Sequence, residues 1–133
     1  MLRSLGLSLA CGWVCVAAQL DAVSYGRYLV DVVGKCGECH TPVEADGESV
    51  RNTNLRGAAL GVSPICDKKN AAKLAPDLTP SGRLFSKWGE RQLVKYLETG
   101  FDPQGATAQC PMPAYKLRPH DAEAIVTYLK TLR

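Results

Sequence analysis

Hydrophobic residues recur at helical spacing in three segments of this chain, and each segment predicts a helix. The first segment covers residues 24–35, and its apolar face comprises Tyr25, Tyr28, Leu29, Val32 and Cys36. The second covers residues 90–99, and its apolar face comprises Leu93, Tyr96 and Leu97. The third covers residues 119–132, and its apolar face comprises Ala122, Ile125, Leu129 and Leu132.

Residues at the ends of the second and third segments indicate where these helices begin and end. Gly89 is a tolerable N-cap, and Gly100 can adopt the left-handed conformation that ends many helices. Pro119 suits the first position of a helix because it has no backbone N–H to leave unpaired. Asp121 then lies near the positive end of the helix dipole.

Long stretches rich in Gly, Pro, Asn and Asp separate the predicted helices. They cover residues 41–73, 75–82 and 101–117, and none shows the alternating pattern of a strand. We therefore expect an all-α domain of three to four helices joined by long loops. Loops of this length bury little of their own surface, so a large, flat, apolar cofactor would have to replace the missing protein core.

The N-terminal residues 1–18 have the pattern of a secretory signal peptide. Arg3 provides the positive charge, residues 5–16 the apolar stretch, and residues 16–18 (Val-Ala-Ala) a small-residue cleavage site. An alternative cleavage site follows Ala22, and an uncleaved membrane anchor is the other alternative. The predicted folded domain is then residues 19–133.

Length and charge suit a single small domain. The chain has 133 residues and a formal net charge of +3, and its charges are interspersed. Lys68, Lys69 and Lys73 form the only local basic cluster, which falls short of a nucleic-acid binding surface. A solvated loop is the preferred interpretation of this cluster, and a docking patch for an acidic partner is the alternative.

The residues 36–40 carry the clearest chemical motif, Cys-Gly-Glu-Cys-His. This C-x-x-C-H pattern is typical of covalent haem attachment, because two thiols at this spacing reach two vinyl groups and the next residue places an imidazole under the iron. A thioredoxin-like pair would begin a helix after a strand, whereas this motif follows a predicted helix. A zinc site would need further ligands at metal spacing, which Cys66 and Cys110 do not provide.

The second axial ligand of the iron is predicted by elimination. Beyond residue 18 the chain has one methionine, Met112, and one histidine besides His40, namely His120. Met112 lies between Pro111 and Pro113, which stiffen its loop. Taken alone, Met112 is better interpreted as a filler of core gaps. With a haem attached, we predict that Met112 binds the iron and that His120 faces solvent.

Residues 25–133 resemble the class I c-type cytochromes. The similarity includes a helix that leads into the C-x-x-C-H motif, a methionine loop and a C-terminal helix. The chain looks most like the cytochrome domains that accept electrons from periplasmic dehydrogenases. The stretches that carry this narrower resemblance are APDLTP at 75–80, Trp88, YLETG at 96–100 and PMPAY at 111–115.

The resemblance implies a cytochrome c fold around one covalent haem c. Cys36 and Cys39 would form the thioethers, and His40 and Met112 would be the axial ligands. The first and last helices would cross with Tyr28 and Tyr128 near the contact. Gly26 lies ten residues before Cys36, slightly further than in the shortest members of the family.

Cys66 and Cys110 are additions to the minimal pattern of this family. Once the haem has used Cys36 and Cys39, a disulfide between these two is the natural pairing for an exported protein. It would close a loop of about 45 residues, which is worth roughly 4 kcal/mol in the chain-entropy model, and would tether Met112. Two buried free thiols are the alternative.

The expected function is electron transfer, because histidine and methionine together leave no open position on the iron. The chain is expected to be an electron carrier or an electron-transfer subunit and not an enzyme, located in the bacterial periplasm.

Its expected partners are a dehydrogenase donor and an oxidase or another cytochrome as acceptor. Nucleic acid is not expected as a partner, and membrane association is expected only if residues 1–18 stay attached. The alternatives are a haem peroxidase or gas-binding protein with labile Met112, and a haem-free thiol oxidoreductase.

Overall fold

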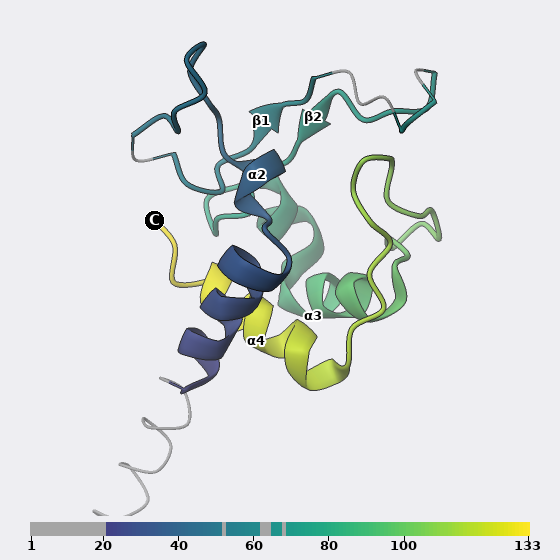
Figure 1. Cartoon of the computed structure of the whole chain (residues 1–133). Helices are drawn as coiled ribbons and strands as arrows, with labels where there is room; N and C mark the ends of the chain where they lie inside the picture. The colour runs from purple at the N-terminus through teal and green to yellow at the C-terminus, as the bar shows by residue number, and fades with distance from the viewer. Residues whose placement is uncertain (1–20, 52, 62–64, 68) are drawn as a thin grey trace, which may run out of the picture.

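The computed structural model describes residues 21–51, 53–61, 65–67 and 69–133, so the predicted signal peptide 1–18 lies outside the described residues. Helices dominate, which confirms the all-α prediction (Figure 1). An α-helix over residues 21–28 continues into the π-helix η1 (Leu29–Val33), and α2 (Gly37–His40), α3 (Arg83–Thr99) and α4 (Pro119–Leu129) follow. Within the described ranges no helix has the length and apolar character needed to cross a membrane.

A two-residue antiparallel pair of strands is the only sheet in the described part of the chain. Strand β1 (Ala58–Ala59) pairs with β2 (Leu74–Ala75), and Ala58 faces Ala75. The other described residues between α2 and α3 are in no helix or named strand, as the long polar stretches of the sequence predict.

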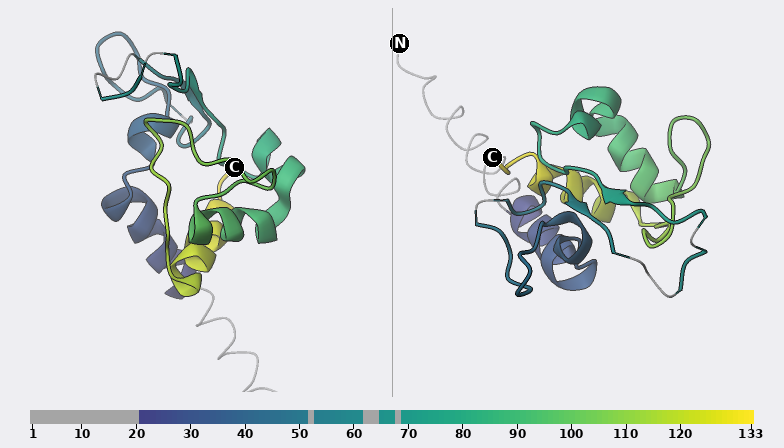
Figure 2. Two further views of the ribbon diagram at one scale, coloured as in Figure 1. Left: turned by 90° about the vertical axis from the view of Figure 1, so that its right-hand side faces the viewer. Right: turned by 90° about the horizontal axis from the view of Figure 1, so that it is seen from above.

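The N-terminal helix crosses α4, as the views in Figure 1 and Figure 2 show from different sides. The contact between the two helices is at Gly26. A Cβ atom on Gly26 would lie only 1.9 Å from the carbonyl oxygen of Ala124 and 2.9 Å from the Cβ of Tyr128. The two backbones therefore approach to a distance that only glycine permits. Tyr128 lies at this contact and is 7% exposed, as the resemblance implies.

The predicted apolar face of the first helix is wrong at two positions. Tyr28 is 51% exposed and Val32 is 57% exposed, whereas Val30 is fully buried. The buried face passes through Gly26 and Val30, one turn apart, because the contact with α4 is centred on the glycine. Glycine has no side chain and so contributes nothing to the apolar spacing. The spacing therefore predicted the neighbouring face of the helix as the buried one.

Helix α3 is two helical segments that meet at Gly89. The backbone of Gly89 has φ 69° and ψ 170°, which is outside the helical region and favours glycine. The segment after it confirms the predicted helix 90–99, and Gly100 ends it with φ 75° and a bond from its N–H to the Tyr96 carbonyl. The segment over residues 83–88 was not predicted, because it is short and carries three basic or polar residues.

Helix α4 begins at Pro119, as predicted, and ends at Leu129, three residues before the predicted end. Its apolar side chains pack into a small core with the N-terminal helix and the loop before β1. The buried members of this core are Val30, Leu55, Ile125, Tyr128 and Leu129. Leu132 is beyond the helix but still packs against this core.

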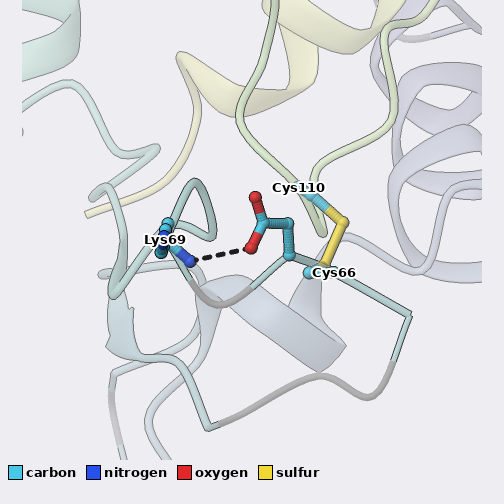
Figure 3. Close-up of a disulfide and its surroundings, with 4 residues drawn as sticks. Cys66, Lys69 and Cys110 are labelled. Carbon is cyan, nitrogen blue, oxygen red and sulfur yellow. Dashed lines mark hydrogen bonds between the residues drawn. A yellow bond between two sulfur atoms is a disulfide. The ribbon is translucent and has the colours of Figure 1, made fainter.

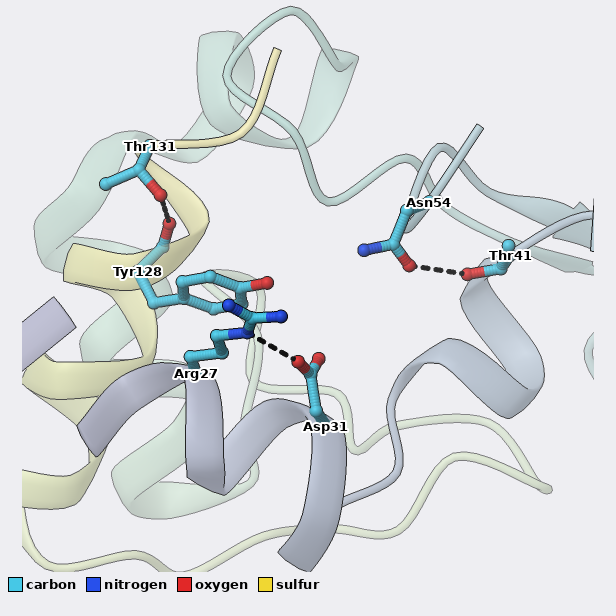
Figure 4. A network of polar contacts seen from close by, with 6 residues as sticks. All are labelled: Arg27, Asp31, Thr41, Asn54, Tyr128 and Thr131. Carbon is cyan, nitrogen blue, oxygen red and sulfur yellow. Dashed lines mark hydrogen bonds and ion pairs between the residues drawn. The ribbon is translucent and has the colours of Figure 1, made fainter. Parts of the chain in front are cut away.

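Hydrogen bonds join the loop before β1 to the C-terminal end of α2. The Thr41 hydroxyl donates to Asn54 Oδ1 at 3.2 Å, as Figure 4 shows, and accepts the Leu55 N–H at 3.0 Å. The Gly57 N–H donates to the carbonyl of His40 at 2.7 Å. These bonds hold the end of the C-x-x-C-H segment in one orientation.

Candidate haem site

A cavity of about 750 Å³ lies between the N-terminal helix, α2, α3, α4 and the long loops. Its volume falls in the range of about 300–1,000 Å³ that is typical of sites for small molecules and cofactors. Most of its wall is apolar, with contributions from Leu29, Val30, Leu78, Leu84, Phe85, Leu93, Leu97, Ile125, Val126 and Leu129. Its charged lining residues are Lys35, Glu38, Asp102 and Asp121.

The short helix α2 presents the motif residues to this cavity. The His40 N–H donates to the carbonyl of Cys36 at 2.9 Å, so one helical turn separates the two residues. Residues three and four apart on a helix lie on the same side, which places Cys39 and His40 beside Cys36. All three line the cavity, and both cysteines are free thiols. Burial raises the pKa of the Cys36 thiol, whereas Cys39 is exposed.

His40 is oriented by a backbone carbonyl far along the chain. The ring is 5% exposed, and its Nδ1 lies 2.8 Å from the carbonyl oxygen of Pro76. A carbonyl can only accept, so Nδ1 carries the proton and Nε2 keeps the lone pair that binds metals. Burial lowers the pKa of His40, although the bond to Pro76 acts in the opposite direction. The structure thus holds a neutral imidazole in a fixed tautomer.

Met112 lines the same cavity as His40, from the loop between α3 and α4. Its side chain is partly buried, and its N–H donates to the carbonyl of Gln109 at 3.0 Å. His120 is exposed at the start of α4 and stacks on the ring of Tyr25, with centroids 5.4 Å apart. The structure therefore brings Met112 to the cavity together with His40, whereas His120 is on the outer surface.

Cys66 and Cys110 are joined by a disulfide in the structure, with Cα atoms 5.8 Å apart (Figure 3). The bond links the loop before β2 to the loop that carries Met112. Beside it, the Asp67 carboxylate accepts the Lys69 N–H at 3.2 Å, which forms a tight turn next to Cys66 (Figure 3). The two cysteines that sequence analysis pairs are thus bonded.

Three aromatic residues at the site lie in stretches that carry the family resemblance, but the sequence did not place them at the cavity: Trp88, Tyr96 and Tyr115. Tyr115 places its hydroxyl near Gly34, beside the sulfur of Cys36, since a Cβ on Gly34 would be 3.6 Å from one and 3.3 Å from the other. Trp88 and Tyr96 both line the cavity, and their ring centroids are 5.2 Å apart. An apolar spacing of Leu84, Phe85 and Trp88 is the signal that could have predicted this wall.

The residues around the cavity fit a haem of the c type. Two free thiols, a neutral imidazole with Nε2 unprotonated, and a thioether surround one apolar space, which is the donor set such a group requires. In the described ranges, no three His, Cys, Asp or Glu side chains gather as a metal site of their own.

Comparison with known proteins agrees with this interpretation. The sequence profile described as Cytochrome c matches residues 24–133. The chain is 34% identical to a protein named diheme cytochrome c-type from Cereibacter sphaeroides, over 89% of this chain and 38% of the relative. It is 32% identical to the fructose dehydrogenase cytochrome subunit of Gluconobacter japonicus, over 84% of this chain and 22% of the relative. The gluconate 2-dehydrogenase cytochrome c subunit of Pantoea cypripedii is also 32% identical, over 87% of this chain and 27% of the relative.

The relatives are considerably longer than the matched region. The chain spans between 22% and 38% of the length of these three proteins. The similarity therefore covers only part of each relative.

Proposed function

The chain belongs to the cytochrome c family and so transfers electrons, and from this premise we propose that it carries a single haem c with histidine and methionine as axial ligands. Cys36 and Cys39 would form the thioether bonds. Nε2 of His40 and the sulfur of Met112 would bind the iron. The observation that carries this proposal is that all four side chains line one apolar cavity.

The residues of the chain define what such a centre does. When bound, the haem supplies an iron that takes up and releases one electron. Pro76 keeps the Nε2 lone pair of His40 available, and ligation by both His40 and Met112 would leave no open position for oxygen or peroxide. The apolar wall excludes water, which favours the uncharged thioether over a charged ligand at the second position.

The proposal of one haem rests on the motif count. The sequence contains one C-x-x-C-H, at residues 36–40. One relative is named as a dihaem protein, but this chain matches only 38% of its length.

We place the protein in the bacterial periplasm as the electron acceptor of a dehydrogenase. Two relatives are named as cytochrome subunits of fructose dehydrogenase and gluconate 2-dehydrogenase, which supports a dehydrogenase as donor. An oxidase or another cytochrome would accept the electron. The signal-like pattern of residues 1–18 supports export. Isolation of the tagged protein from its native periplasm should recover a dehydrogenase that reduces it.

Haem attachment is tested by co-expression with the haem-attachment machinery. The haem should stay with the polypeptide through acid–acetone extraction and denaturing electrophoresis. The variant Cys36→Ala with Cys39→Ala should retain no covalent haem, whereas Cys66→Ser with Cys110→Ser should retain it. Covalent haem in the first variant would show that the motif assignment is wrong.

The methionine ligand is tested by spectroscopy of the iron. The ferric protein should show the weak near-infrared-edge absorption of Met–iron ligation, and the ferrous protein should hardly bind carbon monoxide. Met112→Ala should abolish that absorption, lower the reduction potential, and permit carbon monoxide binding. His120→Ala is the control and should change none of these, because His120 lies on the surface away from the cavity lining. Loss of the low-spin spectrum in His120→Ala, with no change in Met112→Ala, would indicate a bis-histidine centre. Peroxidase activity in a wild-type protein that retains the Met–iron absorption would indicate that the methionine ligand is labile.

A further inference from the structure

We propose that the Cys66–Cys110 disulfide is a positioning element for Met112, holding the sulfur of Met112 at the cavity. The proposal rests on the proposed ligation of the iron by Met112. It assigns a role in the iron site to two cysteines that contact neither thioether position.

The loop that carries Met112 has few bonds of its own. Pro111 and Pro113 flank Met112 and have no N–H to donate. Within residues 108–116, the described backbone donors and acceptors form two bonds, Met112 N–H to Gln109 and Ala72 N–H to the Cys110 carbonyl. The first of these bonds is internal to the loop. Only the second, at 2.8 Å, reaches another part of the chain.

The disulfide reinforces that same point of attachment. Cys110 is two residues before Met112, and its partner Cys66 lies in the segment that leads to β2. The covalent bond and the Ala72 hydrogen bond therefore join the same two loops. In Figure 1 these loops approach each other at the side of the molecule opposite the N-terminal helix.

The anchoring segment is itself tied to His40. The Leu60 N–H donates to the carbonyl of Lys73 at 2.9 Å, beside the β1–β2 pair. Directly after β2, the carbonyl of Pro76 accepts from Nδ1 of His40 at 2.8 Å. One continuous segment, residues 69–76, thus orients His40 at Pro76 and is bonded to the methionine loop at Ala72. Cys66 precedes this segment, so the disulfide adds a covalent link between the methionine loop and the stretch of chain that leads to the partner of His40.

Without the disulfide, the bond from Ala72 to Cys110 would be the one backbone hydrogen bond that joins residues 108–116 to other described residues. A longer unconstrained loop has more conformations in which Met112 is away from the iron. We therefore expect the equilibrium between bound and released Met112 to shift at least tenfold toward release.

The test uses the haem-loaded protein and the variant Cys66→Ser with Cys110→Ser. The near-infrared-edge absorption of the ferric protein is followed as the pH is raised until Met112 is displaced. The midpoint of this loss should fall by about one pH unit or more in the variant, which corresponds to the tenfold shift. Carbon monoxide should also bind the ferrous variant at least ten times faster.

A matched control separates positioning from general stability. Gly26→Ala weakens the contact between the N-terminal helix and α4 at a residue that is not itself part of the cavity lining. It should lower the resistance to denaturant but leave the pH midpoint and the carbon monoxide rate unchanged. Equal effects of both variants on the midpoint would overturn the proposal, because the disulfide would then act only through global stability.

A second measurement covers the case in which the double variant does not fold. The disulfide of the folded wild-type protein is opened with a phosphine reductant, and the two released thiols are counted. Carbon monoxide binding to the ferrous form should then accelerate at least tenfold. Unchanged binding would overturn the proposal while leaving the ligation intact. Absence of the Met–iron absorption from the untreated wild type would instead overturn the ligation, and the positioning role with it.

Discussion

At the residue scale, Gly26 permits the close crossing of the N-terminal helix and α4, because it has no side chain. Adding one methyl group there would place it 1.9 Å from the Ala124 carbonyl oxygen, a backbone atom that cannot rotate away. We expect Gly26→Ala to lower the free energy of unfolding by about 3 kcal/mol, the upper part of the usual range for overpacking. Denaturant unfolding of the haem-loaded protein measures this change.

Gly61 provides the comparison for that experiment. A Cβ atom on Gly61 would meet nothing within 4 Å, and its backbone is not in the left-handed region. Gly61→Ala should therefore change the free energy of unfolding by less than about 0.5 kcal/mol. Similar losses in the two variants would show that the helix crossing is not at Gly26.

The phenol of Tyr25 makes a second residue-scale prediction, on pH. Its hydroxyl donates to Asp121 Oδ1 at 2.9 Å, and this bond is the main cause that raises the pKa of Tyr25 above 10.0. Only the neutral phenol can donate, so this contact contributes fully below pH 10 and is lost as the pH rises through the raised pKa. Asp121→Asn should lower the pKa of Tyr25 because an amide oxygen accepts a weaker hydrogen bond than a carboxylate and carries no charge.

A titration of ¹³C-labelled tyrosine by NMR in the ferrous protein measures that pKa. Glu123→Gln is the control, since Glu123 is an exposed carboxylate on the same helix, two residues from Asp121. It should leave the pKa of Tyr25 unchanged. A pKa of Tyr25 that stays the same in Asp121→Asn would contradict the assignment of the bond as its cause.

At the scale of one element, the N-terminal helix shows what an apolar pattern can and cannot predict. The helix itself was predicted, since its spacing is strong, but the buried face was not. Val30 is fully buried and Val32 is 57% exposed, so two valines of the same helix occupy opposite environments. Val30→Ala should cost about 2 kcal/mol of stability, from lost burial and the cavity left behind. Val32→Ala should cost almost nothing, and chemical denaturation of both variants gives the comparison.

In the other elements, features that depend on neighbouring residues were predicted, whereas features that depend on residues far away in the sequence were not. Gly100 and Pro119 marked helix ends correctly because capping depends on residues that are adjacent in the sequence. The break at Gly89 was interpreted as the start of a helix, and the segment before it was missed. The orientation of His40 could not be predicted at all, because its partner is a backbone carbonyl 36 residues away and has no signature in the sequence.

At the scale of the whole molecule, the long loops leave an apolar cavity where other domains have a protein core. The sequence predicted the loops and, from them, a cofactor in place of a protein core. Among the described residues, the buried cluster that packs α4 against the N-terminal helix has five members, and it adjoins a cavity of about 750 Å³ with a mostly apolar wall. The C-x-x-C-H motif predicted the chemistry of that space because covalent attachment needs residues at fixed local spacing. The disulfide between loops 44 residues apart followed only from the count of remaining cysteines.

This arrangement predicts that folding depends on the cofactor. Side chains that line the cavity, such as Leu84, Phe85 and Leu97, are only partly buried by the protein itself, and the haem that we propose would cover more of their apolar surface. Without it, the small core would have to offset the conformational entropy of more than a hundred residues, which cores of this size do not achieve. The haem-free variant Cys36→Ala with Cys39→Ala should therefore unfold without a cooperative transition in urea, whereas the haem-loaded protein should unfold in a single sharp one. Circular dichroism and tryptophan fluorescence follow both, since Trp88 lies in the cavity wall. A sharp transition of the haem-free chain would show that the core of Val30, Leu55, Ile125, Tyr128 and Leu129 is sufficient by itself.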